Sequence, residues 1–351
     1  MSSLNFKVPS SSMSLPNVAH GISRRRALTL FGAAAGFTLI SKNGAIALPE
    51  GVSLYTWEGR ALGAPAKLTL AHYDRSAAEE IVTTAINEIE RLERVFSLHR
   101  ANSNLSILNR NGHIDTPGAD LLSVLSNSIR FGHQTNGAFD ITVQPLWHLF
   151  SEHFARQPGI QTGPSSHEIE NALDLVGYEK IDVSTGRVRF AKQGMAVTLN
   201  GIAQGYITDR VADLLRDQGI QQVLVELGET RALDDHPDGR PWRIGLADPV
   251  DPKMTTETVE IANESVATSA GSGTVFDGDG HYHHLFDPRN GQPTKHHISA
   301  SVITKRATTA DAMSTALFVL PTSQVEDVVT RIGGIKAVIT TPEGNTHRFV
   351  S

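Results

Sequence analysis

Apolar residues recur in five places along the chain at the three- and four-residue spacing of an amphipathic helix. These places are about residues 76–95, 116–136, 205–218, 309–317 and 323–333. Ser76 and Glu79 have the spacing of a capping box at the start of the first helix. Thr116 and Pro117 suit the start of the second, as N-cap and first-turn proline. Each helix buries one face, so the sequence predicts a core that the helices share with other elements.

Shorter runs with alternating or continuous apolar residues predict strands between these helices. They are an extended start over 55–70, strands over 194–199, 222–227, 242–247, 258–261 and 299–304, and a terminal hairpin of 336–341 and 346–350. The elements do not follow a regular β-α-β alternation, which favours an α+β fold with mixed or antiparallel sheets over a doubly wound parallel sheet. We expect a single unit of two intimate lobes.

The first 47 residues differ from the rest. Their charged residues are all basic, and residues 27–40 form an uncharged, largely apolar run that precedes Ala45-Ile46-Ala47. This pattern is typical of an export signal, and residues 23–28, Ser-Arg-Arg-Arg-Ala-Leu, have the form of a twin-arginine signal. We expect the twin-arginine machinery to export the chain to the periplasm and residues 1–47 to be removed near Ala47, leaving a domain of 48–351. A flexible tail or an uncleaved anchor is the alternative.

Composition narrows the chemistry further. The 351 residues include no cysteine, which excludes disulfides, thiolate nucleophiles and cysteine-ligated metals. The net charge is −6, and loss of the five basic residues in 1–47 would make it −11, so we expect no nucleic acid partner. The sequence also lacks a Walker A loop, a GxSxG elbow and an HExxH motif.

Two segments carry polar residues beside glycines. In residues 137–146, Asp140 stands between Phe139 and Ile141, near a glycine that would let a ligand approach the main chain. A turn in which Asp140 bonds its own backbone is an equal alternative. In residues 198–206, two glycines lie where a strand meets a helix N-terminus, which suits an anionic or phosphate-bearing ligand. An ordinary glycine turn is the alternative there.

Two later segments carry histidines or a carboxylate. Residues 283–291 contain His284 and Asp287, and a zinc or haem site would draw on the histidines at 281, 283, 284, 296 and 297. Their spacing fits no helix-borne ligand pair, so a histidine-rich surface loop is favoured. In residues 308–317, Asp311 and Thr315 lie four apart on one helix face, among small residues. A carboxylate, a hydroxyl and a main-chain oxygen suit Mg²⁺, although an acid near a helix N-terminus also suits the helix dipole.

Taken in order, these segments resemble the FAD:protein FMN transferase family, the ApbE-type flavin transferases, over nearly all of the mature chain. The matching residues are Gly137–Pro145, Gly201-Ile202-Ala203, Gly205-Tyr206, Asp209, His284, Asp287-Pro288, Gly291, Ala310-Asp311 and Thr315-Ala316, with a weaker likeness at Ala61–Ala64 and Phe96–Ser103. The resemblance implies a periplasmic enzyme that uses Mg²⁺ to move FMN from FAD onto a Ser or Thr of an acceptor flavoprotein, releasing AMP.

The resemblance also implies roles for individual residues. Those expected to bind FAD are Ala138, Phe139, Asp140, His99, Thr198, Gln204 and Phe286. Mg²⁺ would be held by the side chains of Asp311 and Thr315 and by main-chain oxygens at Gly201 and Ser314. His284 would lie beside the scissile pyrophosphate, and either His284 or Asp287 would act as the catalytic base.

The chain departs from the family pattern at several positions. Thr198 and Gln204 replace an acid and a base, Leu62 and His99 stand where Met and an aromatic are usual, and Leu-Gly-Glu at 227–229 replaces Leu-Gly-Gly. The segment Leu-Asn-Gly-Ile-Ala-Gln-Gly-Tyr at 199–206, together with the twin-arginine signal, is most similar to the branch of the family associated with nitrous oxide reductase maturation. In that branch the acceptor would be a membrane flavoprotein. Two other functions stay open: a periplasmic FAD-binding maturation protein without turnover, and a metal-handling protein that uses the histidine cluster.

Overall fold

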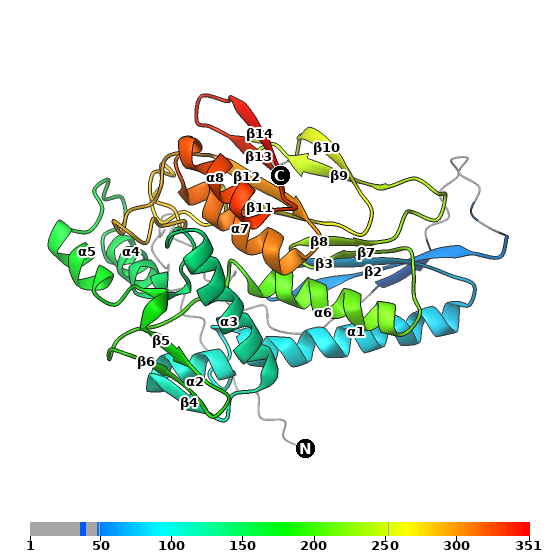
Figure 1. The fold of residues 1–351 in the computed structure, drawn as a ribbon, viewed down its shortest axis with the longest axis horizontal. Coiled ribbons are helices and arrows are strands. Elements are labelled where there is room, and N and C mark those ends of the chain that lie inside the picture. The colour runs from blue at the N-terminus through cyan, green and yellow to red at the C-terminus, as the bar shows by residue number, and fades with distance from the viewer. Residues whose placement is uncertain (1–35, 40–47, 49, 252) are drawn as a thin grey trace, which may run out of the picture.

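A nine-stranded antiparallel sheet forms the centre of the molecule (Figure 1). The computed structural model describes residues 36–39, 48, 50–251 and 253–351. The sheet order is β1 (Gly36–Leu39), β2 (Ser53–Ala61), β3 (Ala64–His72), β7 (Val223–Glu226), β8 (Thr230–Leu233), β11 (Ser265–Ala270), β12 (Ser299–Thr304), β13 (Lys336–Thr340) and β14 (Thr346–Val350). The predicted signal, 1–47, lies outside the described residues except for β1, which pairs with β2 at the sheet edge.

Three helices pack on one face of this sheet (Figure 1). They are α1 (Arg75–Phe96) against β2 and β3, α6 (Ala203–Asp217) against β7 and β8, and α7 (Ala307–Val319) against β11 and β12. The main hydrophobic core fills the space between helices and sheet. Helix α7 is buried on nearly all sides, because it lies between α6 and the sheet. Its small residues permit this close packing.

Successive side chains of a strand point to opposite faces of the sheet, so a second core forms on the face opposite the three helices. Val223 and Val225 join the main core, while Leu224 between them joins a cluster with Trp242 and Ile261. The last two belong to a two-stranded ribbon of β9 (Trp242–Ala247) and β10 (Thr255–Ile261). The ribbon therefore covers the face of the sheet that the helices leave open.

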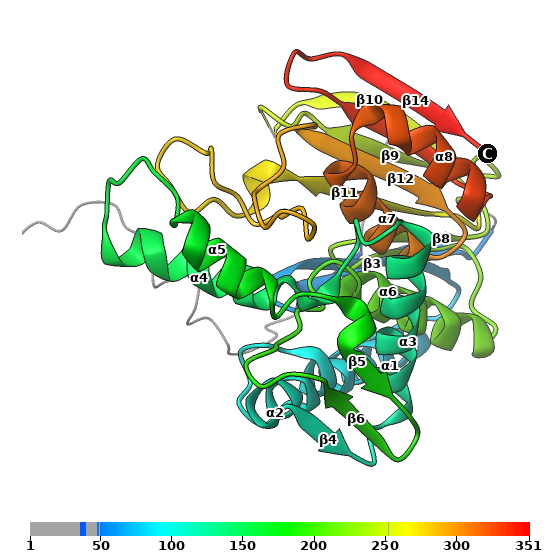
Figure 2. The same cartoon turned by 60° about the vertical axis from the view of Figure 1, so that its left-hand side comes forward.

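The remaining elements surround this body. They are α2 (Asn104–Asn111), α3 (Ala119–Gln134), α4 (Gln144–Arg156), α5 (Ser166–Leu173), α8 (Thr322–Ile332), a small sheet of β4 (His113–Asp115), β6 (Arg187–Phe190) and β5 (Ile181–Val183), and 3₁₀ turns at Ile141–Val143, Tyr178–Lys180 and Gly271–Gly273. In Figure 2, α4 and α5 extend away from the sheet beside the segment that joins β11 to β12. A third hydrophobic cluster joins these helices to that segment through Phe150, Phe276 and Phe286.

The α+β prediction with antiparallel sheets is confirmed, and some boundaries differ. The predicted capping box at Ser76 is wrong: Asp74 caps α1 by accepting hydrogen bonds from the main-chain N–H groups of Ser76 and Ala77. Helix α3 begins at Ala119 after Gly118, and Thr116 lies outside it with a φ of 46°. Among the described residues, no helix combines the length and apolar character needed to cross a membrane.

The predicted strand over 194–199 is also wrong, although its burial alternates as a strand's does. The side chain of Asn109 takes the place of a neighbouring strand. Its amide group donates to the main-chain oxygen of Val197 and its carbonyl oxygen accepts from the N–H of Val197, both at 2.8 Å. The N–H of Thr198 donates to the carbonyl oxygen of Ile141. Val197 and Thr198 are therefore bonded without joining a sheet.

Candidate functional site

Residues 198–206 and residues 308–317, two of the predicted segments, meet where α6 packs on α7. A Cβ atom added to Gly205 would lie 2.3 Å from the carbonyl oxygen of Ala307 and 2.8 Å from the Cβ of Asp311. Only glycine fits this approach without moving a helix. The N–H of Gly205 donates to Asp311 Oδ2 at 2.9 Å. The N-terminus of α6 is thus bonded directly to the carboxylate predicted to bind a cation.

Gly201, in residues 198–206, brings this contact close to residues 137–146. A Cβ on Gly201 would lie 2.9 Å from Thr315 Oγ1 and 3.5 Å from the ring of Phe139. The hydrogen bond from Thr198 to Ile141 links the same two loops. Residues separated by more than a hundred positions therefore converge on one point, as the predictions at Phe139, Gly201, Asp311 and Thr315 require.

Three hydroxyl groups lie close together beside the helix turn that carries Asp311. Ser314 Oγ donates to the main-chain oxygen of Asp311 at 2.9 Å and lies 2.8 Å from Ser269 Oγ. Ser269 Oγ is also 3.2 Å from Thr315 Oγ1. Ser269 is at the end of β11, and sequence reasoning missed it. Its signal was the polar run Thr268-Ser269 in a strand that faces a helix of small residues.

Two carboxyl groups in this region have no positively charged partner. Asp311 is 4% exposed and Glu229 is 9% exposed, and no salt bridge to either is found in residues 50–251 and 253–351. Burial raises the pKa of Asp311 to about 7. Burial, and next the charge of Asp311, raise the pKa of Glu229 well above its usual value. A hard divalent cation is the partner that such an oxygen-lined, negatively charged site fits.

By contrast, the neighbouring carboxylate of Asp209 is neutralised by arginine side chains. Asp209 on α6 is completely buried and pairs with Arg231 at 2.7 Å and with Arg306 at 3.1 Å. It also accepts hydrogen bonds from the N–H groups of Ala307 and Thr308, the first residues of α7. A carboxylate at a helix N-terminus is stabilised by the helix dipole. Asp209 therefore fixes the start of the helix that carries Asp311 and Thr315.

The side chain of Asp140 bonds its own neighbourhood. Its Oδ1 accepts from the N–H and hydroxyl of Thr142 at 2.8 and 2.6 Å, and its Oδ2 accepts from the N–H of Tyr178 at 2.9 Å. Burial raises the pKa of Asp140. This is the local turn that the sequence left open as an alternative. Ala138 and Phe139 are 1% and 3% exposed, and the Phe139 ring packs edge-on against Phe131.

His284 and Asp287, the two candidates for the base, lie in different surroundings. His284 Nδ1–H donates to the carbonyl oxygen of Thr274 at 3.1 Å, which leaves Nε2 as the unprotonated nitrogen of the neutral ring. Burial lowers the pKa of His284 to about 4. Asp287 is held by both Arg289 Nε at 2.7 Å and Arg289 Nη2 at 2.8 Å, and it closes a turn. His284 is therefore the group with a free basic atom.

The other residues predicted to bind FAD lie in several places. Gln204 is in the first turn of α6 and contacts Gly228, where an added Cβ would be 2.3 Å from its Nε2. His99 is exposed in the loop after α1. Phe286 is buried in the third cluster, with its ring centroid 5.0 Å from that of Phe150. Thus Gln204 lies beside the converging segments, whereas Phe286 packs as a core residue.

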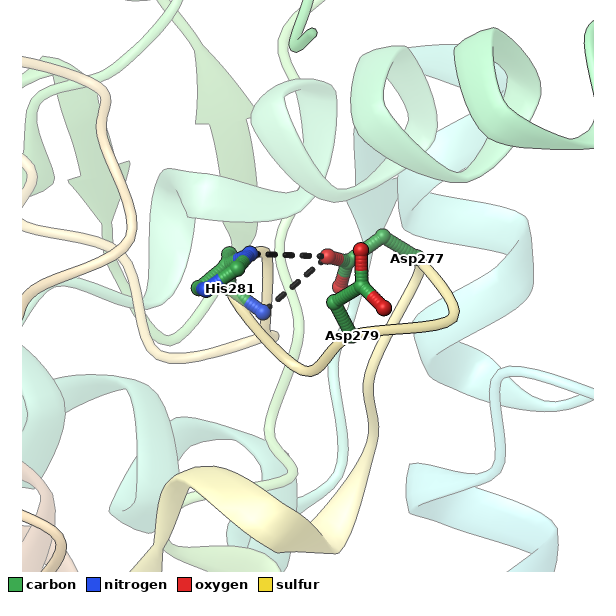
Figure 3. A group of neighbouring side chains, drawn as sticks. All are labelled: Asp277, Asp279 and His281. Atoms are coloured by element: carbon green, nitrogen blue, oxygen red, sulfur yellow. Dashed lines mark hydrogen bonds and ion pairs between the residues drawn. The ribbon is translucent and has the colours of Figure 1, made fainter. Parts of the chain in front are cut away.

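The histidines do not form one cluster. His283 Nε2–H donates to the carbonyl oxygen of Thr294, and His297 Nδ1–H donates to that of Phe318, so both are buried structural groups. In the part of the chain that the structure describes, the group of three possible metal ligands is instead Asp277, Asp279 and His281, whose ligand atoms lie within 4.8 Å of one another (Figure 3). Asp277 already accepts the N–H groups of His281 and Tyr282. The geometry supports a surface turn.

Comparison with known proteins shows the family of the chain. The model of the ApbE family matches residues 62–339. A relative from Vibrio cholerae serotype O1, an FAD:protein FMN transferase, is 33% identical over 247 residues, which are 68% of this chain and 73% of the relative. An Escherichia coli K12 protein of the same name is 26% identical over 303 residues, 83% and 85% of the two chains.

Solved structures give the same result for the fold. The apo form of the Pseudomonas stutzeri flavinyl transferase ApbE aligns with a TM-score of 0.74 and 28% identity, covering 85% of this chain and 95% of that one. The Thermotoga maritima ApbE protein aligns with a TM-score of 0.73 and 28% identity, covering 84% and 97%. The arrangement of sheet and helices is therefore shared along nearly the whole length of these proteins.

Proposed function

The chain belongs to the ApbE family and is an FAD:protein FMN transferase; from this premise we propose that it requires Mg²⁺, transfers FMN to a Ser or Thr hydroxyl and releases AMP. The observation that carries the cation requirement is the pair of buried carboxyl groups, Asp311 and Glu229, which no basic side chain in the described ranges neutralises. Asp311, Thr315 and the main-chain oxygens of Gly201 and Ser314 would hold the ion. An ion held by these residues would supply polarisation of the pyrophosphate and stabilisation of the negative charge on the departing AMP.

The residues of the chain account for the rest of the reaction. Phosphoryl-type transfer depends mainly on positioning and on charge stabilisation. The turn at Gly201 allows close approach of the main chain, whereas the N–H groups of Ala203 and Gly205 in the first turn of α6 already donate to Leu199 and Asp311. FAD would bind beside this turn, next to Gln204.

His284 supplies the base in this proposal. Its hydrogen bond to Thr274 fixes the tautomer with a free Nε2, and its lowered pKa keeps the ring neutral at pH 7. A neutral Nε2 can accept the proton of the acceptor hydroxyl as that oxygen attacks phosphorus and the pyrophosphate bond to AMP breaks. Asp287 instead holds the turn through its paired contact with Arg289.

The experiment combines the mature chain, FAD, Mg²⁺ and an acceptor domain that contains a candidate Ser or Thr. Expected results are in-gel flavin fluorescence of the acceptor and an equal amount of AMP. Both should disappear with EDTA and with an acceptor in which that hydroxyl is replaced by Ala. Transfer that continues unchanged in EDTA would contradict the cation requirement.

FAD binding without turnover, the alternative to this activity, rests on departures from the family pattern. Thr198 and Gln204 are neutral, and Gln204 packs on Gly228 next to Glu229. If FAD binds at micromolar concentration but neither AMP nor a labelled acceptor forms with several acceptor domains, the protein is a binder. AMP formation that needs both FAD and acceptor excludes this function.

We also propose export and a membrane-bound acceptor. The basis is the sequence of residues 1–47 together with the branch that the Leu-Asn-Gly-Ile-Ala-Gln-Gly-Tyr segment resembles. Replacing Arg24 and Arg25 by Lys should leave the full-length chain in the cytoplasm, as cell fractionation would show, while an Arg26→Lys control is exported. Covalent flavin should then be lost from a membrane flavoprotein of the nitrous oxide reductase system. Periplasmic recovery of the double variant would contradict the twin-arginine assignment.

A further inference from the structure

Glu229 is a buried acid at a position where the sequence resemblance gives glycine. It follows Gly228, which has a φ of +96°, in the turn between β7 and β8. The N–H of Leu227 donates to the main-chain oxygen of Glu229 at 2.9 Å and closes this turn. Main-chain bonds therefore close the turn, and the acidic side chain of Glu229 takes no part in closing it.

The position of its carboxylate follows from the sheet. Strands β8 and β11 pair through Ser265 with Arg231 and Val266 with Thr230. Strand β11 continues to Ala270, beyond the end of this pairing, and the N–H of Thr268 donates to the carboxylate of Glu229. The next residue is Ser269, whose hydroxyl contacts Ser314 and Thr315. Thr208 Oγ1 on α6 lies 3.5 Å from the main-chain oxygen of Glu229, and Gln204 contacts Gly228, so the turn that carries Glu229 packs on the start of α6 beside the candidate cation site.

The local charges make this arrangement unfavourable without a cation. Glu229 and Asp311 are both buried, and the charge of Asp311 raises the pKa of Glu229. The two nearby arginines, Arg231 and Arg306, pair instead with Asp209 and Asp213. A buried charge without a partner is costly. A divalent cation between the acids would remove that cost, and added carboxylates raise the affinity of an oxygen-lined site.

We propose that Glu229 is a second carboxylate of the cation site, acting with Asp311 to bind a divalent cation that prefers oxygen ligands. This inference rests on the proposed function, since it concerns the same site. The family-like ligands alone would provide one carboxylate. With Glu229 the site carries two negative charges, so this chain binds its cation more tightly than a version with a neutral residue at 229.

Isothermal titration of the mature chain with MgCl₂ and with MnCl₂, without FAD, tests the proposal. In Glu229→Gln the amide oxygen still accepts from Thr268, so only the charge is removed, and affinity should fall by about 10- to 100-fold. Glu226→Gln is the matched control: it is three residues away on the same hairpin, with its side chain toward Lys67 at 3.9 Å, and should bind like wild type. Glu229→Gly should lose affinity as Glu229→Gln does.

Thermal unfolding separates this role from a structural one. In EDTA, Glu229→Gln should unfold at the same temperature as wild type or higher, because one of two repelling acids is gone; in Mg²⁺ the order should reverse. A merely structural role would lower the unfolding temperature in both solutions. Equal affinity of wild type and Glu229→Gln overturns the inference and leaves the proposed function intact. Absence of cation binding by wild type overturns the cation requirement itself.

Discussion

Replacement of Asp311 by Asn should make the cation-free protein more stable at neutral pH and abolish flavin transfer. Burial raises the pKa of Asp311 from 3.8 to about 7 in the folded chain. The folded protein therefore retains a proton that the unfolded chain releases between pH 4 and 7, and stability without cation falls as the pH rises through this window. A shift of about three units corresponds to about 4 kcal/mol, which is fully lost above pH 7.

Asn cannot ionise, and its carbonyl oxygen can still accept from Gly205. Urea unfolding in EDTA should therefore give Asp311→Asn an unfolding free energy up to about 4 kcal/mol above that of wild type at pH 8, and nearly equal values at pH 4. With Mg²⁺ at about 100 times its dissociation constant, wild type should gain about 2.7 kcal/mol and the variant nothing. Asp327→Asn, a change at an exposed position of α8, is the control. Parallel pH profiles of wild type and Asp311→Asn in EDTA would refute the reasoning.

Three further changes test other parts of the site. His284→Ala should lower kcat for FMN transfer by roughly 10²- to 10⁴-fold. Because the pKa of His284 in the folded protein is about 4, protonation of its ring should not lower the wild-type rate until the pH approaches 4. Loss of rate between pH 7 and 6 that disappears in His284→Ala would contradict this. Asp209→Asn leaves two arginines without a full partner and should cost about 3–5 kcal/mol in urea unfolding; a cost below about 1 kcal/mol would show that α7 is fixed by other contacts. Gly205→Ala places a methyl group against Ala307 and should cost about 1–3 kcal/mol with weaker Mg²⁺ binding by calorimetry, whereas unchanged binding would mean that the two helices separate freely.

The helices of the main core could be predicted because their apolar spacing is long and regular. α1, α6, α7 and α8 all occur where the sequence placed them, as do β9, β12 and the terminal hairpin. The start of α7 could not be found locally, since its cap, Asp209, is on another helix. Nor could the pattern around Val197 distinguish a strand from a segment bonded by Asn109, because both bury alternate residues.

The prediction of the site rested on the order of the segments rather than on any single residue. The structure brings Asp311, Thr315, Gly201 and Phe139 close together, and the contacts of Gly205 explain why small residues are needed there. The local bonds of Asp140 and the pairing of Asp287 with Arg289 were not visible in sequence, because each depends on the direction of one side chain. In the sequence, Glu229 stood out only as a departure from the family pattern. A role in cation binding could be proposed for it only once the structure was known.

The hydrogen bond between Gly205 and Asp311 joins positions 106 residues apart, which imposes an order on biosynthesis. When α6 leaves the ribosome, the carboxylate that it must contact has not yet been translated. Nascent chains that stop before residue 311 cannot complete the site, so capture of the nucleotide must await nearly full-length polypeptide. In the proposed function, competence for the reaction thus arises late in translation, and a product that terminates before residue 311 lacks the carboxylate that the cation site needs.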